Sequence, residues 1–566
     1  MGDLREEQLI TTYGPGSIID LLDYPVLIQS ASYWLKEEVG NNYDPVNSES
    51  LKIQDLAIHE LVEKKLMELT ESSSFKIKKI KGLMKPPPEA NEFNQYLGTI
   101  ASKVITAQRF PRYHKCLKCN TLSKLDKEDQ DTKCRKCGGK LEATRWILTC
   151  KNGHIHDFNW HKFMRDKTNC DCDPTENKNG SSSLTYRDSG RSGTFRDIKL
   201  NCKTCAKEVT LTSLKNDEIR CNGKMRWFKD TSENCGEILK FEPRGKSSIY
   251  VSETLNKISL PKEDKFSDLS IDHSHVFDML RQNNSKDGLK TILSILKVET
   301  VDIDEYFAWL NKHNETSDFL ESNKNYEEEE FRLLSSDEAI SDAEFNSEQI
   351  DLTNSKFISN HFQSINKISR LKIVNVLLGF RRAFEEKSRF HAVTTNEQFV
   401  PAVESFGEGI FFKMNNNLLH DWSNKNGNNV DKYKLLHSLS HFLMHEFAYV
   451  SGFSITELKE IIYFQDESKD AGILIYTSSG DSQCSMGGLA DLADAEKIET
   501  IIKNGLNKIT ACSNDPFCIN EHQACFSCLM TPEICCNEAP QEKNTKLSRA
   551  YLTKITETTP FFDIEI

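Results

Sequence analysis

The chain has 566 residues, among them 18 cysteines, and a formal net charge of −13. This length exceeds what one hydrophobic core usually organises, so we expect several domains. The acidic balance excludes a protein coated in phosphate-binding cations, so any contact with nucleic acid must be local. No cationic, apolar leader opens the sequence, and no uncharged apolar window is long enough to cross a membrane. We therefore expect a cytoplasmic protein without membrane contact, whose reduced thiols are available for metal.

Residues 1–110 are predicted to form a mixed α/β leader. The segment from Leu9 to Asp20 indicates a strand, a Gly/Pro turn and a second short strand or helix. A group of lysines further on is a local candidate for nucleic-acid contact, and a solvated basic segment is the alternative. These lysines are Lys76, Lys78, Lys79, Lys81 and Lys85.

Residues 111–245 are predicted to be a cysteine-rich region with about three zinc sites. The clearest pattern consists of two Cys-x2-Cys pairs, each of which lets one tight turn offer two sulfurs to the same ion. This first site comprises Cys116, Cys119, Cys134 and Cys137. A redox Cys-x2-Cys would leave the second pair unexplained, so we favour structural zinc.

The remaining cysteines of this region are expected to fill two further sites. One set, in which Gly223 and Gly236 allow tight turns, comprises Cys202, Cys205, Cys221 and Cys235. The other set has one imidazole and comprises Cys150, His154, Cys170 and Cys172. His156 and His161 compete with His154 for this role. The partition leaves no thiol of the region unused.

Residues 246–400 are predicted to be mostly helical. Ten carboxylates and one basic residue lie between Glu327 and Asp351, as expected of an exposed helix or a linker. The apolar residues between positions 365 and 384 are dense and are followed by Arg381 and Arg382. This pattern predicts a buried helix that ends in cations.

Residues 401–566 are predicted to form a mixed α/β domain with its own zinc site. We expect a helix at about 433–450, a buried strand at 472–477, and after it a loop in which the backbone approaches closely. The predicted ligands of this site are Cys518, Cys525, Cys528 and Cys536. Cys512 and Cys535 remain possible substitutes, because a tetrahedral site needs only four of the six cysteines.

Three histidines on the predicted helix are the main candidates for catalysis. His437, His441 and His445 follow one another at intervals of four residues and share one stripe of the helix. A Glu directly after the first His, as zinc proteases require, is missing, and no Gly-x4-Gly-Lys-Ser/Thr phosphate loop occurs. We therefore assign no catalytic residue and favour a packed or interface-lining stripe over a catalytic metal site.

Several motifs together resemble a known family. The C-terminal third contains Gly407-Glu408-Gly409, Leu436-His437-Ser438 and Cys525-x2-Cys528-Leu529, and it resembles the helicase-associated zinc-binding domain of the MrfA type. The opening Gln8 to Gly16 and the run Arg109-Phe110-Pro111 are similar to DrmB subunits of the DISARM antiphage system, which carry that domain without a motor. The resemblance implies pairing with DrmA, a helicase-like ATPase, and action on incoming phage DNA.

The expected fold is α+β and multidomain, with zinc-ribbon-like N-terminal modules, a helical middle region and a C-terminal mixed α/β zinc-binding domain. The expected cofactor is Zn²⁺, about four ions. The favoured function is a non-catalytic, zinc-binding subunit of an antiphage complex that contacts a helicase-like ATPase and DNA. The alternatives are a metal-dependent nuclease or phosphoesterase that uses the histidine stripe, and a free-standing zinc protein that binds DNA.

Overall fold

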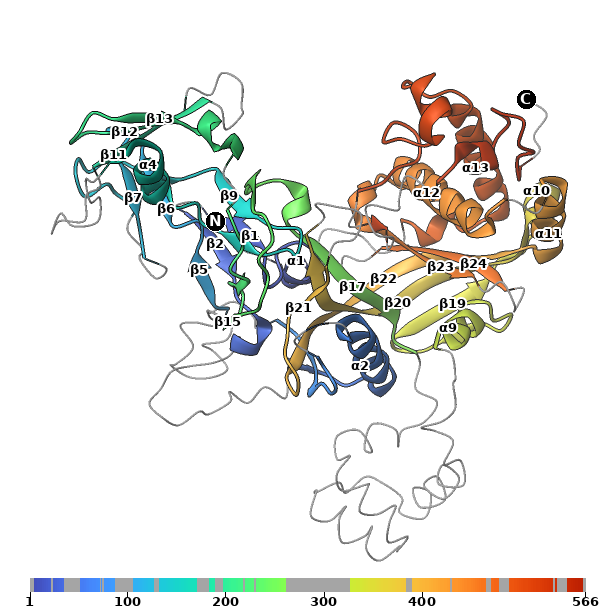
Figure 1. Ribbon diagram of the computed structural model, residues 1–566. Coiled ribbons are helices and arrows are strands. Elements are labelled where there is room, and N and C mark those ends of the chain that lie inside the picture. Colours follow the sequence, from blue (N-terminus) through green and yellow to red (C-terminus); the bar gives the residue numbers. More distant parts are fainter. Residues whose placement is uncertain are drawn as a thin grey trace, which may run out of the picture. The chain divides into compact units, whose positions relative to one another are not determined.

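Figure 1 presents the computed structural model, in which the chain forms two compact units. Unit 1 comprises Met1–Ile53, Leu61–Leu255 and Asn375–Val403, and unit 2 comprises Gln54–Glu60, Asn256–Val374 and Glu404–Ile566. The structure describes residues 5–21, 24–34, 51–71, 73, 76–86, 105–126, 132–170, 183–188, 197–216, 219–228, 231–260, 326–382, 389–427, 430–464, 470–477, 488–532, 535–536 and 547–562. The helices and sheets of these residues confirm the predicted α+β class.

The leader in unit 1 begins with a helix, so the strand predicted there is wrong. α1 (Glu6–Thr11) carries two glutamates in its first turn, where the helix dipole stabilises negative charge. After the Gly/Pro turn, β1 (Ile18–Asp20) pairs with β2 (Pro25–Ile28), and β2 pairs with β5 (Ala107–Arg109). The buried apolar pair inside α1 is too short to show a helical period in the sequence.

The cysteine-rich region of unit 1 consists of short antiparallel sheets. Their strand orders are β7-β6-β8, β10-β9-β16 and β11-β12-β13, and β14 pairs with β15. The elements are β6 (Tyr113–Cys116), β7 (Leu122–Lys124), β8 (Leu141–Ala143), β9 (Trp146–Thr149), β10 (Ile155–His156), α4 (Trp160–Thr168), β11 (Leu184–Asp188), β12 (Ile198–Cys202), β13 (Glu208–Thr210), β14 (Lys224–Met225), β15 (Thr231–Ser232) and β16 (Lys240–Pro243). Because these strands are short, their ends and turns depend on additional cross-links.

Of the lysines proposed as a nucleic-acid contact, four precede β4 (Gly82–Met84), which pairs with β3 (Lys52–Ile53), and Lys85 directly follows it. Ile77 and Ile80, which alternate with them, are buried. Lys76, Lys78, Lys79 and Lys81 are exposed and Lys85 is half-buried. The two isoleucines therefore anchor the segment, and most of its lysines remain exposed. This exposure agrees with both alternatives, a contact with nucleic acid and a basic segment that is only solvated. The helix α2 (Leu56–Thr70) lies before it in the sequence.

Unit 2 is built on a sheet with the strand order β18-β19-β20-β22-β24-β23. The chain passes between the two units after β3, inside α2, and inside the strands β17, β20 and β22. The strands are β17 (Val251–Ile258), β18 (Ile340–Ser341), β19 (Phe345–Gln349), β20 (Phe362–Arg381), β21 (His391–Ala392), β22 (Phe399–Met414), β23 (Leu458–Phe464) and β24 (Ala471–Thr477). β24 confirms the strand predicted at 472–477.

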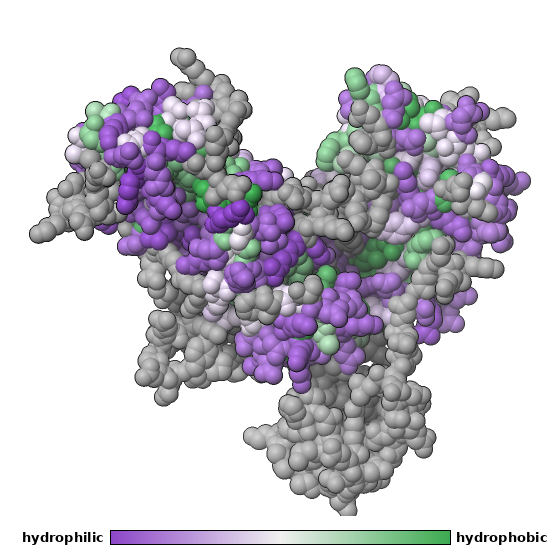
Figure 2. Space-filling view, in the orientation of Figure 1, coloured by the Kyte–Doolittle hydropathy of each residue, from purple (hydrophilic) through white to green (hydrophobic). Residues whose placement is uncertain are grey.

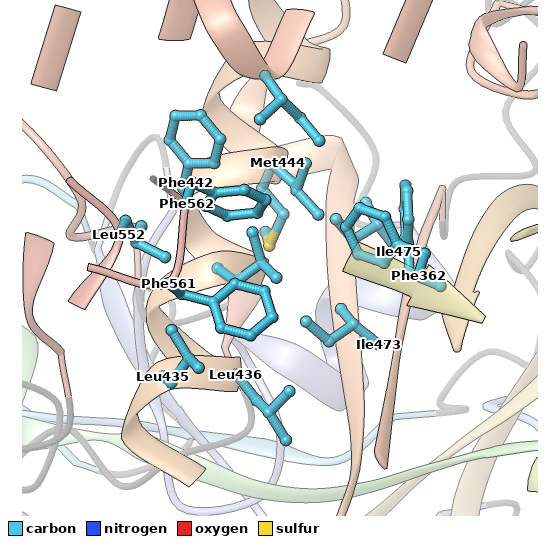
Figure 3. Close-up of a cluster of buried hydrophobic side chains, with 14 of the residues drawn as sticks. Phe362, Leu435, Leu436, Phe442, Met444, Ile473, Ile475, Leu552, Phe561 and Phe562 are labelled. Atoms are coloured by element: carbon cyan, nitrogen blue, oxygen red, sulfur yellow. The ribbon is translucent and has the colours of Figure 1, made fainter. Parts of the chain in front are cut away.

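Both faces of this sheet are buried in unit 2. On one side, Ile473 and Ile475 of β24 join a core with α12 (Lys432–Ser451) and α13 (Ala495–Ile509), part of which is drawn in Figure 3. On the other side, Leu474 and Tyr476 pack with α9 (Tyr326–Leu334). Figure 1 accordingly has α12 and α13 on one side of the sheet and α9 on the other. The described residues of the unit also form the helices α10 (Lys356–His361) and α11 (Asn416–Lys425).

The buried helix predicted at 365–384 is wrong, because this segment forms the long strand β20. Its apolar residues divide between several cores: Ile365 lies in the α12 core, Ile368 in the α9 core, and Phe380 in a core of unit 1. A strand that is buried on both faces has a continuous apolar sequence, which periodicity cannot distinguish from a buried helix. In the described part of 246–400, strands therefore predominate over helices.

The acidic segment is more structured than a linker. It begins with α9 and continues in the hairpin of β18 and β19. Glu330 is fully buried on α9, where its carboxylate accepts hydrogen bonds from Lys257 Nζ at 3.0 Å and from the Ile258 amide at 2.8 Å. Solvation therefore accounts for the exposed carboxylates of this segment but not for Glu330.

α12 confirms the helix predicted at about 433–450. Asp431 caps its first turn by accepting from the Lys434 amide at 3.1 Å, and Gly452 ends it with a φ of +80°.

Most of the described residues on the face shown in Figure 2 are hydrophilic. Among the described helices, none has the length and apolar character that crossing a bilayer requires.

Candidate metal centres

Cysteine, histidine and glutamate side chains converge in five places within the described ranges. In each group the potential ligand atoms all lie within 4.8 Å of one another. The groups are cluster A (Cys116, Cys119, Cys134, Cys137), cluster B (Cys150, His154, Cys221, Cys235), cluster C (Cys170, Cys202, Cys205), cluster D (Cys512, Cys518, Cys525, Cys528) and cluster E (His437, His441, Glu460, Cys536).

Cluster A brings together the first predicted set. The turn after β6 supplies Cys116 and Cys119, and the turn before β8 supplies the other two cysteines. The Cys119 amide points to Cys116 Sγ at 3.4 Å, as in a turn built to stabilise a thiolate. A Cβ on Gly139 would lie 2.9 Å from Cys116 Sγ, so only glycine leaves room for the sulfur. Burial raises the pKa of Cys119, but hydrogen bonding with Thr121 and the neighbouring thiols outweighs it and lowers the pKa.

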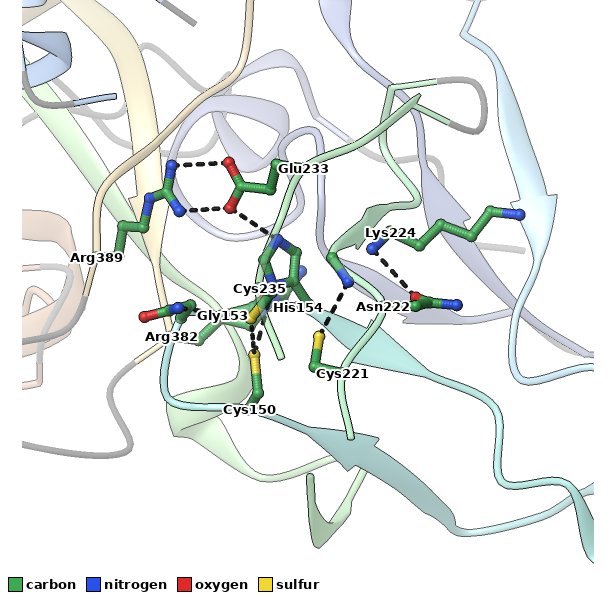
Figure 4. A network of polar contacts seen from close by, with 12 residues as sticks. Cys150, Gly153, His154, Cys221, Asn222, Lys224, Glu233, Cys235, Arg382 and Arg389 are labelled. Atoms are coloured by element: carbon green, nitrogen blue, oxygen red, sulfur yellow. Dashed lines mark hydrogen bonds and ion pairs between the residues drawn. The ribbon is translucent and has the colours of Figure 1, made fainter. Parts of the chain in front are cut away.

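Cluster B joins the ends of two hairpins (Figure 4). Cys150 and His154 flank the turn between β9 and β10, while Cys221 precedes β14 and Cys235 follows β15. Cys150 Sγ lies 3.4 Å from His154 Nδ1 and 3.9 Å from Cys235 Sγ. The Gly223 amide points to Cys221 Sγ at 3.3 Å. The cluster therefore offers three sulfurs and one imidazole nitrogen.

The imidazole of cluster B is held by a carboxylate that the sequence did not predict. His154 Nε2 lies 3.1 Å from Glu233 Oε1, and both side chains are buried. Arg389 Nη2 donates to Glu233 Oε2 at 2.9 Å and pairs with the other oxygen as well (Figure 4). Because a carboxylate can only accept, its position favours the tautomer with the proton on Nε2 and a bare Nδ1 toward Cys150. This is how metal-binding histidines are usually oriented.

Of the competing histidines, neither replaces His154. His156 Nε2 lies 3.2 Å from Cys221 Sγ, at the edge of cluster B. Burial, together with Arg226, lowers the pKa of His156 to about 3, so its ring is neutral. His161 Nδ1 lies 3.5 Å from the Tyr113 hydroxyl, away from the sulfurs.

Cluster C explains why two of the predicted sets must be regrouped. Cys170 follows α4 and meets Cys202 and Cys205 at the turn between β12 and β13, with its Sγ 3.4 Å from that of Cys205. The predicted partition had placed Cys170 with Cys150 and His154, and had joined Cys202 and Cys205 to Cys221 and Cys235. The structure exchanges these pairs, because hairpin pairing decides which turns face one another. Cys172, predicted beside Cys170, lies outside the described residues.

Cluster D contains three of the four predicted C-terminal ligands. Cys512 takes the fourth position, with its Sγ 3.4 Å from that of Cys525, and Cys518 Sγ lies 3.7 Å from Cys528 Sγ. The carboxylate of Asp515 accepts from the Cys512 amide at 2.8 Å and thereby fixes this turn. The predicted fourth ligand, Cys536, lies instead in cluster E.

The histidine stripe of α12 does not act as one set. His437 and His441 enter cluster E, whereas His445 Nε2 lies 3.2 Å from the Met530 carbonyl oxygen. Cys535 Sγ contacts the Ile455 carbonyl oxygen at 3.2 Å and belongs to none of the clusters. Residues 478–487, with the predicted close-approach loop and Cys484, lie outside the described residues.

The spacing in clusters A, B and D fits zinc. Tetrahedral Zn²⁺ with sulfur at about 2.3 Å places neighbouring sulfurs about 3.8 Å apart, and a sulfur and an imidazole nitrogen about 3.6 Å apart. The sulfur pairs in close contact lie between 3.4 and 3.9 Å apart, and Cys150 Sγ lies 3.4 Å from His154 Nδ1. All are far longer than the disulfide length of about 2.05 Å. The donor sets are the thiolates and imidazole that structural zinc prefers.

Comparison with known proteins agrees with this chemistry. Residues 439–529 match the MrfA Zn-binding domain, and residues 5–251 match a domain of unknown function (DUF8724). The chain is 26% identical over 543 residues to DISARM protein DrmB of Bacillus paralicheniformis, covering 81% of this chain and 91% of that protein. The expected resemblance to DrmB is confirmed. The match to the MrfA Zn-binding domain includes every cysteine of cluster D, but neither His437 nor Cys536 of cluster E.

A weaker likeness links the chain to a solved structure, described as DUF1998 helicase MrfA bound to DNA. It has 13% sequence identity and a TM-score of 0.19, and covers 36% of this chain and 25% of that helicase. A likeness at this level does not bear on the fold or the contacts of the chain. The similarity to DrmB extends over much more of the chain.

Proposed function

We propose that the chain is a non-catalytic zinc-binding subunit of a DISARM-type antiphage complex, in which it binds a helicase-like ATPase of the DrmA type and helps to engage DNA. The observation that carries this proposal is the similarity to DrmB along nearly the whole length of that relative. In this role, clusters A, B, C and D bind zinc and fix the turns that hold them. A filled structural site contributes on the order of 10 kcal/mol to local folding, which such short strands need.

The zinc turns themselves offer a surface for a protein partner. Leu117 lies inside the first Cys-x2-Cys turn of cluster A and is 56% exposed. In cluster D, Phe526 lies inside the Cys525–Cys528 turn and is 69% exposed, and Phe517, directly before Cys518, is 68% exposed. Large apolar side chains that a rigid turn holds in water are typical of binding sites for other proteins. We propose that Phe517 and Phe526 contact the ATPase.

Contact with DNA is proposed for the exposed lysines before β4. They are local, as the acidic balance of the chain requires, and the buried isoleucines Ile77 and Ile80 anchor the segment that carries them. Each phosphate contact that a lysine makes should add about one to the slope of log affinity against log salt. The groove lined by Lys115, Arg145 and Arg244 is less suitable, because Lys115 pairs with Glu142 at 3.0 Å and Arg244 with Asp20 at 2.8 Å.

The nuclease alternative finds little support in the geometry. It needs His437, His441 and His445 on one open metal site, whereas His445 contacts a backbone carbonyl and the first two are fully buried. A catalytic zinc keeps a coordination position open to water or substrate. We therefore propose that the ATPase partner carries the catalytic activity of the complex.

The test is to purify the full chain alone and together with a DrmA-type ATPase. We expect a stable complex and ATP hydrolysis that requires the partner, with no DNA cleavage by the isolated chain in added divalent metal. Phe526→Ser should weaken the complex at least about tenfold, while Met67→Ser, which alters a 47% exposed residue of α2, should leave it unchanged. ATP hydrolysis by the isolated chain, or failure of the two proteins to associate, would overturn the proposal.

A further inference from the structure

Cluster E collects its side chains from three separated elements of unit 2. His437 and His441 lie one turn apart on α12, Glu460 lies on β23, and Cys536 lies beyond the cysteines of cluster D. The two histidines are fully buried, Glu460 is 2% exposed and Cys536 is 7% exposed. Such polar groups are rarely brought together in a protein interior unless each finds a partner.

The hydrogen bonds around His441 leave two lone pairs facing each other. Its Nδ1 lies 2.9 Å from the Leu529 carbonyl oxygen, which can only accept, so Nδ1 carries the proton. In the neutral ring Nε2 is then bare, and it points at Glu460 Oε1 at 3.3 Å. Two acceptors at this distance repel each other unless a cation lies between them or the ring takes up a second proton on Nε2. A carbonyl that fixes the other ring nitrogen is the usual support of a metal-binding histidine.

The spacing of the four ligand atoms fits one tetrahedral ion. With Zn–N and Zn–O distances of about 2.1 Å and Zn–S of about 2.3 Å, nitrogen and oxygen ligands lie about 3.4 Å apart and nitrogen and sulfur about 3.6 Å apart. His437 Nε2 lies 3.5 Å from Glu460 Oε1 and 3.3 Å from Cys536 Sγ. Ser440 Oγ donates to Oε2 of Glu460, so this hydrogen bond orients the carboxylate through the oxygen that is not among the four ligand atoms.

We propose that cluster E is a second metal site beside cluster D, in which His437, His441, Glu460 and Cys536 bind one Zn²⁺ with two nitrogens, one oxygen and one sulfur. With four protein ligands and full burial, the site is closed and structural. It fastens the chain that follows cluster D to α12 and β23. Clusters D and E are linked through two adjacent residues. Cys528 is a ligand in cluster D, and the carbonyl oxygen of Leu529 orients His441 in cluster E.

The experiment is to measure bound zinc per chain in the purified full-length protein and in two matched pairs of variants. Cys536→Ala and His437→Gln should each lose one zinc ion per chain. Their controls are Cys535→Ala, which changes the adjacent buried cysteine, and His445→Gln, which changes the third histidine of the same helix. Both controls should keep the zinc content of the unaltered protein. Equal zinc content in all five proteins would overturn the proposal and would leave an imidazolium–carboxylate pair as the explanation of cluster E.

A measurement on the unaltered protein covers the case in which the ligand variants do not fold. X-ray absorption at the zinc edge counts imidazole ligands, and cluster E supplies two of them in addition to His154 of cluster B. We expect two or more imidazoles per chain, and one or none would contradict the site. This readout involves neither the ATPase nor DNA, so it is independent of the proposed function.

Discussion

Glu233 Oε1 lies 3.1 Å from Nε2 of His154, in a place where both side chains are almost completely shielded from water. The contact orients the ring so that Nδ1 faces the sulfurs of cluster B, and Arg389 donates to the Glu233 carboxylate and balances its charge. One interaction between residues far apart in the sequence thus decides which nitrogen is available to zinc.

Replacing Glu233 should weaken zinc binding at cluster B without removing a ligand. For Glu233→Ala we expect the affinity of one zinc ion per chain to fall about 10–100-fold, because the ring loses the acceptor that fixes its tautomer. Competition with a chromophoric chelator measures this. Glu237→Ala is the control, because the Glu237 side chain pairs with the half-exposed Lys151 and the substitution leaves the backbone of the residue in place. Equal zinc release from the two variants would show that Glu233 has no such role.

Two glycines that flank cluster B should respond differently to alanine. Gly223 and Gly236 have φ values of +68° and +74°, so either substitution strains the backbone by roughly 1–2 kcal/mol. A Cβ on Gly223 would also lie 1.7 Å from the Glu233 carbonyl oxygen, whereas one on Gly236 meets nothing within 4 Å. Gly223→Ala should therefore lower the melting temperature distinctly more than Gly236→Ala. The reverse order would contradict the packing of the β14–β15 hairpin.

The adjacent arginines at the end of β20 should differ strongly in their effect on stability. Arg382 is 1% exposed and donates to the carbonyl oxygens of Gly153 and Gly16, both at 2.8 Å, and to that of Ile249. Arg382→Ala should cost at least about 3 kcal/mol, because it leaves buried acceptors without donors. Arg381 forms a partly exposed pair with Glu253 at 2.8 Å, so Arg381→Ala should cost less than about 1 kcal/mol. Urea denaturation of the two variants compares these costs directly.

Zinc removal should unfold the turns of cluster A before the sheet of unit 2. The core around cluster A contains little besides its own cysteines, Leu125 and Leu141, whereas β24 is buried along its whole length. After treatment with a strong chelator, hydrogen exchange should accelerate in residues 113–143 and remain slow in β24. Acid should act in the same direction, because protonation of the thiolates releases zinc. Unchanged exchange in 113–143 would mean that metal does not hold these turns.

The sequence determined much of this protein by local spacing. A Cys-x2-Cys pair lies within a single turn, so each such pair in cluster A and in cluster D can offer two sulfurs to one ion whatever surrounds it. The α12 helix and the β24 strand also follow from local patterns, because cap residues and apolar runs of typical length mark them. The resemblance to DrmB depends on such local motifs and is confirmed by the alignment over most of the chain.

Only the tertiary structure decided how distant segments combine. The pairing of β9 with β10 and of β14 with β15 joins Cys150 and His154 to Cys221 and Cys235, and no spacing along the chain encodes which hairpins meet. β20 resembles a helix in sequence, because a strand covered on both faces loses its alternation. No pattern in the sequence singles out Glu460, because only the fold brings this residue of β23 close to His437 and His441 of α12. The local sequence thus indicates which residues can bind metal, and the packing of distant segments decides which of these residues lie together.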